Sequence, residues 1–153
     1  MKVCILGNSL TSLTLAKTLV NQGIYVDMIP DTKTIRPDKL RTIGISKSNL
    51  NFFNKNILDI ENLTWKIKRI KIFLGHLQDK EILNFEEDNN LFSIVQNSEL
   101  YKILMLSLKK NVFFKIKKNN TYQHLSNNYD LVFNSNPNHL ITKKFFYKKI
   151  DKN

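Results

Sequence analysis

The first 30 residues constrain the fold more than any other part of this 153-residue chain. They begin with KVCILG, an apolar run that ends at Gly7 and is typical of a strand buried on both faces of a parallel sheet. Apolar residues then recur at helical spacing from Leu10, and Gly23 stands where the C′ glycine of a helix is expected. The next run, IYVDMI, predicts a second strand. This order and length predict a parallel βαβ unit.

The turn between the first strand and the helix, LGNSLTS, lies where dinucleotide-binding proteins carry GxGxxG. In that pattern the first glycine makes the tight turn, the second lets the pyrophosphate approach the backbone, and the third allows close packing of helix on strand. Gly7 keeps the first position, whereas Ser9 and Ser12 replace the other two glycines. Serine is small, its hydroxyl can donate to a phosphate oxygen, and the helix amides remain an anion site. The loop, with Asn8, is therefore either a dinucleotide-phosphate site or a crossover turn without a ligand.

A carboxylate that binds the ribose usually closes the second strand of such a unit, about 20 residues beyond the loop. That spacing falls on Pro30, and Asp31 follows it directly. Asp31 is therefore the candidate ribose ligand, and the alternative is a turn residue beside proline.

Short strands are expected between residues 41 and 96. RTIGIS predicts a strand followed by a helix that Ser46 or Ser48 caps. WKIKRIKIFLG alternates well enough from Lys68 to Leu74 to predict a half-exposed strand there, with KEILNFE and LFSIV as its antiparallel partners. Residues 63–95 are therefore expected to form a small antiparallel insertion.

The last third of the chain returns to an α/β order. NSELYKILMLSLKKN predicts a helix with one apolar stripe, capped by Asn97 or Ser98. VFFKIK and YDLVF predict strands that join the parallel sheet, and the Asn-rich KKNNTYQHLSNN indicates a loop between them. We therefore expect one α/β domain over 1–153, a Rossmann-like βαβ sheet with a small antiparallel β annex, and a basic tail over 143–153.

The composition leaves the class of partner open. The formal net charge of +11 indicates either a polyanionic partner or AT-biased coding that enriches lysine without selection for charge. The lysines are spread along the chain, which favours the second explanation. No run reaches the roughly 18 apolar residues of a membrane span. Cys4 is the only cysteine, which excludes an internal disulfide, and we expect a cytoplasmic protein.

Motifs for metal binding or nucleophilic catalysis are missing from the sequence. The three histidines are widely spaced, so no metal site is expected. Cys4 lies inside an apolar strand and is expected to be a small buried side chain rather than a nucleophile. Trp65 and the phenylalanines are expected in the core.

Three segments beyond the loop occur in an order that resembles the FAD-dependent aromatic hydroxylases of ubiquinone biosynthesis, the 2-polyprenylphenol hydroxylase-like enzymes. PDKLRTIGIS is similar to a stretch in which an Asp and an Arg precede a short strand ending in Ser, here Asp38, Arg41 and Ser46. FSIVQNSELYKILMLSL is similar to their next strand and helix. YDLVFNSNPNHL lies where they carry DLV followed by GADG, although NSNP at residues 134–137 replaces GADG.

The resemblance implies the N-terminal, FAD-binding portion of a flavin-dependent monooxygenase. In that family FAD carries out aromatic ring hydroxylation with O2, and NAD(P)H or another donor supplies electrons. The second flavin-binding motif of the family lies beyond the part that this chain resembles, so we expect the chain alone to be inactive and assign no catalytic side chain. The cofactor-binding residues expected on this basis are Gly7, Asn8, Ser9, Ser12, Asp31 and Arg41.

The partners expected from the resemblance are FAD, proteins of a quinone pathway, and an anionic membrane surface to which the basic tail would bind peripherally. No specific nucleic acid is expected. Two other classes of function stay open. One is a degenerate Rossmann-like module that binds no flavin and acts through protein contacts, and the other is a basic nucleic-acid-binding module.

Overall fold

A computed structural model describes residues 1–30, 41–74, 77–88, 90–117, 125, 127–136, 139 and 141–142 of the chain. The chain divides into two compact units, one made of Met1–Arg36 with Ile103–Asn153 and the other of Pro37–Lys102. The features of the sequence analysis that lie outside the described residues include Asp31 with the loop around it, most of the Asn-rich segment KKNNTYQHLSNN, and the basic tail over 143–153.

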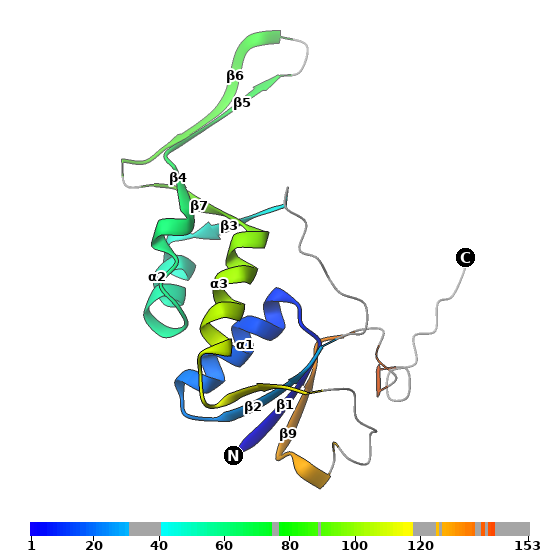
Figure 1. Cartoon of the computed structure of the whole chain (residues 1–153). Coiled ribbons are helices and arrows are strands. Elements are labelled where there is room, and N and C mark those ends of the chain that lie inside the picture. The colour runs from blue at the N-terminus through cyan, green and yellow to red at the C-terminus, as the bar shows by residue number, and fades with distance from the viewer. Residues whose placement is uncertain are drawn as a thin grey trace, which may run out of the picture. The chain divides into compact units, whose positions relative to one another are not determined.

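The first unit is built on the βαβ motif that the sequence predicts (Figure 1). Strand β1 (Lys2–Leu6) leads through helix α1 (Leu10–Asn21) to strand β2 (Tyr25–Ile29), and the two strands pair in parallel. Gly23 adopts a φ of +71°, the left-handed conformation in which a C′ glycine ends a helix. The end of α1 was therefore predicted correctly from a single glycine.

Two more strands complete a four-stranded parallel sheet. β8 (Phe114–Ile116) pairs with β2, and β9 (Leu131–Asn134) pairs with β1, which gives the order β8-β2-β1-β9. VFFKIK and YDLVF therefore join the parallel sheet as predicted. Because the strands are parallel, their carboxyl ends meet at one edge, which is where ligands bind in open α/β sheets.

The parallel sheet is buried on both faces, as its apolar strands predict. Successive side chains of a strand point to opposite faces. Val3 and Ile5 point to one face and are fully buried. Cys4 and Leu6 alternate with them on the other face, where they form an apolar cluster with Ile29 and Leu125. The burial of Cys4 confirms that it is a core residue.

Helix α3 (Asn97–Lys109) carries the predicted apolar stripe, with Leu100, Leu104 and Leu108 buried. The expected cap is wrong, because the helix begins at Asn97 and strand β7 runs directly into it. The Asn97 N–H donates to the Arg41 carbonyl at 2.9 Å, and Asn97 Oδ1 is buried without a hydrogen-bond partner.

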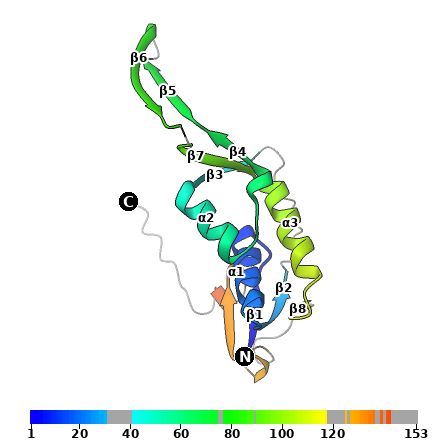
Figure 2. The same cartoon turned by 90° about the vertical axis from the view of Figure 1, so that its left-hand side faces the viewer.

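The second unit contains two antiparallel sheets. β3 (Thr42–Ser46), β7 (Phe92–Gln96) and β4 (Thr64–Ile67) form a sheet in the order β3-β7-β4. β5 (Arg69–Leu74) and β6 (Leu77–Glu86) form a separate hairpin (Figure 2). The strand predicted from Lys68 to Leu74 is confirmed as β5, and KEILNFE pairs with it in β6. The prediction that LFSIV also pairs with this strand is wrong, because β7 pairs with β3 and β4 instead.

Helix α2 (Lys47–Asn56) starts at a cap that the sequence predicts, since Ser46 Oγ accepts the N–H of Asn49 at 3.3 Å. A short 3₁₀ helix η1 (Glu61–Leu63) follows.

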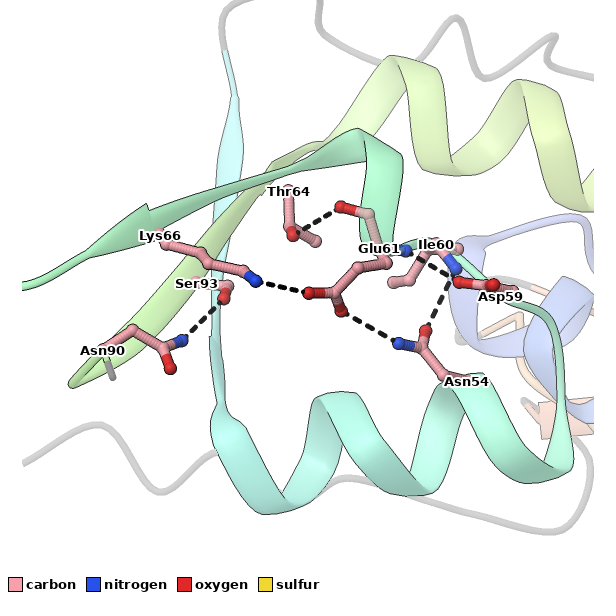
Figure 3. Close-up of polar contacts among 8 residues, drawn as sticks. All are labelled: Asn54, Asp59, Ile60, Glu61, Thr64, Lys66, Asn90 and Ser93. Carbon is pink, nitrogen blue, oxygen red and sulfur yellow. Dashed lines mark hydrogen bonds and ion pairs between the residues drawn. The ribbon is translucent and has the colours of Figure 1, made fainter. Parts of the chain in front are cut away.

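Polar contacts around η1 tie the end of α2 to β4 (Figure 3). Asn54 Oδ1 accepts the N–H of Ile60 at 3.0 Å, and Asn54 Nδ2 donates to the Glu61 carboxylate at 3.2 Å. The other carboxylate oxygen of Glu61 pairs with Lys66 Nζ at 2.7 Å. These contacts satisfy the polar groups of the turn within the second unit.

Several aromatic residues expected in the core are exposed. Trp65 is 57% exposed and Phe52 is 59% exposed. On the β5–β6 hairpin, Ile70 lies opposite Phe85 on one face, while Arg69 pairs with Glu86 on the other. Phe52 lies on helix α2, and Trp65 lies beside Ile94 of β7, whereas Val95, on the other face of that sheet, is fully buried. Formation of a helix or strand therefore does not by itself bury an aromatic side chain.

Candidate functional site

The loop from β1 to α1 lies at the carboxyl edge of the parallel sheet and makes the tight turn that the sequence predicts at Gly7. Gly7 has a φ of +110°, and its N–H donates to the Ile29 carbonyl at 2.9 Å. A Cβ at this position would lie 2.6 Å from Ser135 Oγ. Both the backbone angle and the available space therefore require glycine here.

The N-terminus of α1 offers backbone N–H groups beside this turn. Ser9 is the N-cap, with φ −67° and ψ 169°, and its Oγ accepts the N–H of Ser12 at 3.3 Å. The N–H groups of Leu10 and Thr11 have no acceptor within the helix, as in any first helical turn. No acidic residue stands in this turn, so the positive end of the helix dipole is not neutralised there. The turn is suited to an anion.

Three serine hydroxyls form a hydrogen-bonded chain at this edge. Ser135 Oγ lies 2.9 Å from the Leu6 carbonyl oxygen, Ser12 Oγ lies 2.5 Å from Ser135 Oγ, and Ser9 Oγ lies 3.0 Å from Ser12 Oγ. A carbonyl oxygen only accepts, so Ser135 donates its single proton to Leu6. Ser12 must then donate to Ser135, and Ser9 must donate to Ser12. The donation from Ser135 to the Leu6 carbonyl therefore fixes the direction of the other two hydrogen bonds between the serines.

Each of the three serine hydroxyl protons is therefore donated to an acceptor within the protein. Ser12, at the position of the third glycine, is 1% exposed and accepts from Ser9 while donating to Ser135. Ser9, at the position of the second glycine, also holds the Ser12 amide. In this arrangement neither hydroxyl has a proton free for a phosphate oxygen.

Among the described residues of this loop, Asn8 alone has a buried side-chain polar atom without a hydrogen-bond partner. It is 8% exposed, and its Oδ1 is buried without a hydrogen-bond partner. A buried unsatisfied carbonyl group costs about 1–3 kcal/mol. Rotation about χ2 exchanges the carbonyl oxygen and the NH₂ group of an asparagine, so this side chain has both an acceptor and a donor to offer to a ligand.

Two of the sequence-predicted site residues are not part of this loop. Asp31 lies outside the described residues. Arg41 belongs to the second unit, where its side chain is exposed and its carbonyl accepts from Asn97. Both remain predictions.

Toward its amino edge the same sheet carries a charged cluster that the sequence analysis missed, and Asp27 at its centre lies opposite Cys4. Asp27 is 4% exposed and accepts from Tyr129 Oη at 2.9 Å, and Lys2 Nζ lies 3.4 Å from the same carboxylate. Lys2 also lies over the Tyr129 ring, 4.8 Å from its centroid. An aspartate in the middle of the apolar strand IYVDMI was the only signal in the sequence, because a buried carboxylate requires partners.

This cluster suppresses ionisation of its neighbours. Burial, together with the charge of Asp27, raises the pKa of Cys4 from 9.0 to about 12. Burial and the hydrogen bond to Asp27 also raise the pKa of Tyr129 above its usual value. The thiol is therefore protonated at neutral pH, and the cluster lacks a nucleophile.

Metal clusters and membrane-spanning helices are not found in the described part of the chain. It contains no group of three or more His, Cys, Asp or Glu side chains that could hold a metal ion. None of its helices is long and apolar enough to span a membrane.

Comparison with known proteins identifies the fold. No protein-family model matches the sequence, and no curated protein matches it. Among solved structures, the p-nitrophenol 4-monooxygenase PnpA from Pseudomonas putida DLL-E4 matches with a TM-score of 0.64 at 14% identity, over 77% of this chain and 31% of that chain. PqsL, a probable FAD-dependent monooxygenase from Pseudomonas aeruginosa, matches with a TM-score of 0.62 at 12% identity, over 81% and 36%.

HpxO from Klebsiella pneumoniae, solved with FAD and uric acid, matches with a TM-score of 0.58 at 16% identity, over 76% of this chain and 30% of that chain. The chain spans about a third of the length of these structures. At such low identity the likeness establishes the fold, an α/β parallel sheet with antiparallel strands that corresponds to part of a larger Rossmann-like fold. This confirms the fold class predicted from the sequence.

Proposed function

We propose that this chain is the FAD-binding portion of a flavin-dependent monooxygenase and that the loop between β1 and α1 binds the pyrophosphate. The observation that carries the proposal is the carboxyl edge of the parallel sheet, where Gly7 makes a turn only glycine can make and Asn8 is buried without a partner. The fold shared with PnpA, PqsL and HpxO supports it, since HpxO was solved with FAD.

The residues of the loop fit the pyrophosphate part of the cofactor. Gly7 sets the turn, the Leu10 and Thr11 amides donate to phosphate oxygens, and the Asn8 amide turns its NH₂ group toward them. In the proposed site Ser9 and Ser12 line the same turn. When bound, FAD would supply the redox and oxygen chemistry.

The finer assignment rests on the sequence resemblance. We assign the chain to the ubiquinone-biosynthesis type of hydroxylase, with Asp31 at the ribose and Arg41 beside the flavin. NAD(P)H as electron donor, quinone-pathway proteins as partners and peripheral attachment of the basic tail to an anionic membrane belong to the same proposal. The similarity of PDKLRTIGIS and DLV to that family supports it.

A titration of FAD, ADP and FMN into the purified protein tests the proposal. We expect FAD to bind with 1:1 stoichiometry, ADP to retain much of the affinity because it contains the pyrophosphate, and FMN to bind far more weakly because it lacks it. Circular dichroism first establishes that the protein is folded. Absence of FAD binding at high-micromolar concentration in the folded protein contradicts the proposal.

A second candidate function is a Rossmann-like module that binds no dinucleotide and acts through protein contacts. The serine chain favours it, because Ser9, Ser12 and Ser135 satisfy one another without a ligand. The same titration separates the two, since this module binds neither FAD nor ADP. Binding to a random oligonucleotide that weakens steeply with salt would instead identify a basic nucleic-acid-binding module.

A further inference from the structure

We propose that Ser9 competes with the phosphate for the helix N-terminus, so that the loop is closed by its own side chain until a ligand displaces it. This inference rests on the proposed function and adds how the affinity of that site is set. In a loop with glycine at this position no side chain is present to take a helix amide. Here the Ser9 hydroxyl takes the N–H of Ser12.

Hydrogen bonds through Ser12 and Ser135 hold the Ser9 hydroxyl in this position. Ser9 donates to Ser12, Ser12 donates to Ser135, and Ser135 donates to the Leu6 carbonyl. The N–H of Ser135 also donates to the Leu6 carbonyl, at 3.0 Å. The closed loop is therefore anchored to the ends of β1 and β9, not only to its own helix.

A phosphate that reaches the Ser12 amide must displace the Ser9 hydroxyl. The displaced hydroxyl loses its bond to Ser12 Oγ, and its proton becomes free to donate to the ligand. Asn8 takes part in the exchange, because its Oδ1 is buried without a partner and rotation about χ2 would bring the NH₂ group to that place as a donor for the ligand. The loop thus changes from an internally satisfied state to a ligand-satisfied state through rotation of two side chains.

The competition predicts an unusual result, because removing a polar group from the site strengthens binding. Ser9→Ala removes the internal cap and leaves the Ser12 amide for the ligand. An N-cap hydroxyl is worth a free energy that corresponds to about a fivefold change in affinity. We therefore expect Ser9→Ala to bind FAD and ADP about fivefold more tightly than the wild-type protein.

The chain offers a matched control in Ser46, which caps α2 with the same geometry. Its Oγ accepts the N–H of Asn49 at 3.3 Å, the same distance as in the Ser9 cap. Ser46→Ala removes an equivalent cap in the second unit, where no phosphate loop is proposed. We expect it to leave the FAD and ADP affinities unchanged. Isothermal titration calorimetry of the two variants and the wild-type protein gives the comparison.

A ligand-free measurement examines the internal cap itself. Hydrogen exchange of the Ser12 amide, followed by NMR, should become faster in Ser9→Ala, whereas the Asn49 amide should become faster only in Ser46→Ala. If Ser9→Ala does not fold, Ser9→Gly replaces it, because glycine is tolerated at an N-cap.

The outcomes distinguish this inference from the proposed function. Tighter binding by Ser9→Ala than by the wild-type and Ser46→Ala proteins supports both, as does binding by Ser9→Ala when the wild-type protein binds nothing measurable. Wild-type binding that Ser9→Ala matches or weakens overturns the competition by Ser9 and leaves the FAD site standing. Absence of binding in every folded variant overturns the proposed function and the competition with it.

Discussion

At its carboxyl end β1 runs into a neutral network of serine hydroxyls, whereas at its amino end it joins a charged cluster around a buried aspartate. The hydroxyl network of Ser9, Ser12 and Ser135 carries no charge and leaves helix amides beside it. The cluster of Lys2, Asp27 and Tyr129 uses its charges on one another. The carboxyl end therefore keeps unpaired helix amides for an outside anion, whereas the charges at the amino end are paired with one another.

Substitution of Gly7 by alanine is expected to have the largest effect. The left-handed backbone and the approach of Ser135 Oγ to 2.6 Å of a new Cβ act together, so we expect Gly7→Ala to lower the free energy of unfolding by about 3 kcal/mol. Urea denaturation measures it.

Gly23 provides the control for backbone strain alone, since it has a φ of +71° and no atom within 4 Å of an added Cβ. Gly23→Ala should cost about 1 kcal/mol. Addition of Ser135→Ala to Gly7→Ala should recover part of the loss, because it removes the atom in the way. A cost for Gly7→Ala no larger than that for Gly23→Ala contradicts a tightly packed carboxyl end.

Loss of the Asp27 carboxylate is expected to have the next largest effect. Asp27→Ala leaves Tyr129 Oη without its acceptor inside the fold, whereas Lys2 is exposed enough to turn to water. We expect a loss of about 2 kcal/mol in the free energy of unfolding, with no change in FAD affinity.

Asp130 is the matched aspartate at the same end, because its exposed carboxylate accepts the backbone N–H of Lys2 at 2.6 Å. Asp130→Ala should cost no more than about 0.5 kcal/mol. Equal costs for the two variants, or a change in FAD affinity with Asp27→Ala, would remove the distinction between the two ends of the sheet.

Alkaline pH should destabilise the amino end by a smaller amount. The Cys4 thiol has a pKa of 9.0 when exposed and about 12 in the fold, so the unfolded chain loses this proton first. Stability is therefore complete below pH 9 and falls as pH rises toward 12, by about 1 kcal/mol at pH 10. The raised pKa of Tyr129 acts in the same direction at still higher pH.

Urea denaturation at pH 8 and pH 10 measures this loss. The Cys4→Ala variant lacks the thiol and should lose less stability between the two pH values than the wild-type protein. The same loss in both proteins would show that Cys4 is not responsible.

Local patterns were enough to predict the elements that position the site. The change from an apolar run to helical spacing placed β1 and α1, and Gly23 and Ser46 marked a helix end and a helix start. Such features depend on residues a few positions apart, which a single sequence displays directly. The replacement of two glycines by Ser9 and Ser12 was also visible in the sequence, and in the structure these two serines hydrogen-bond to each other.

Contacts between distant residues were not predictable in this way. Ser12 and Ser135 are 123 positions apart, and Asp27 and Tyr129 are 102 apart, so no local spacing records either hydrogen bond. The pairing of LFSIV with β4 rather than with β5 also depends on residues far apart in the sequence. Trp65 is exposed because burial is decided by the presence of a covering layer, not by hydrophobicity alone.

An NMR titration of the 15N-labelled protein with ADP tests most directly whether the two ends of the sheet have different roles. We predict that the amide signals of residues 7–12 shift with saturation at one equivalent, that the Ser12 amide shows the change from the Ser9 cap to the ligand, and that the amides of Asp27 and Asp130 do not move. Shifts at the amino end, or unchanged signals at residues 7–12 in the presence of excess ADP, would contradict the assignment of the carboxyl end as the phosphate site.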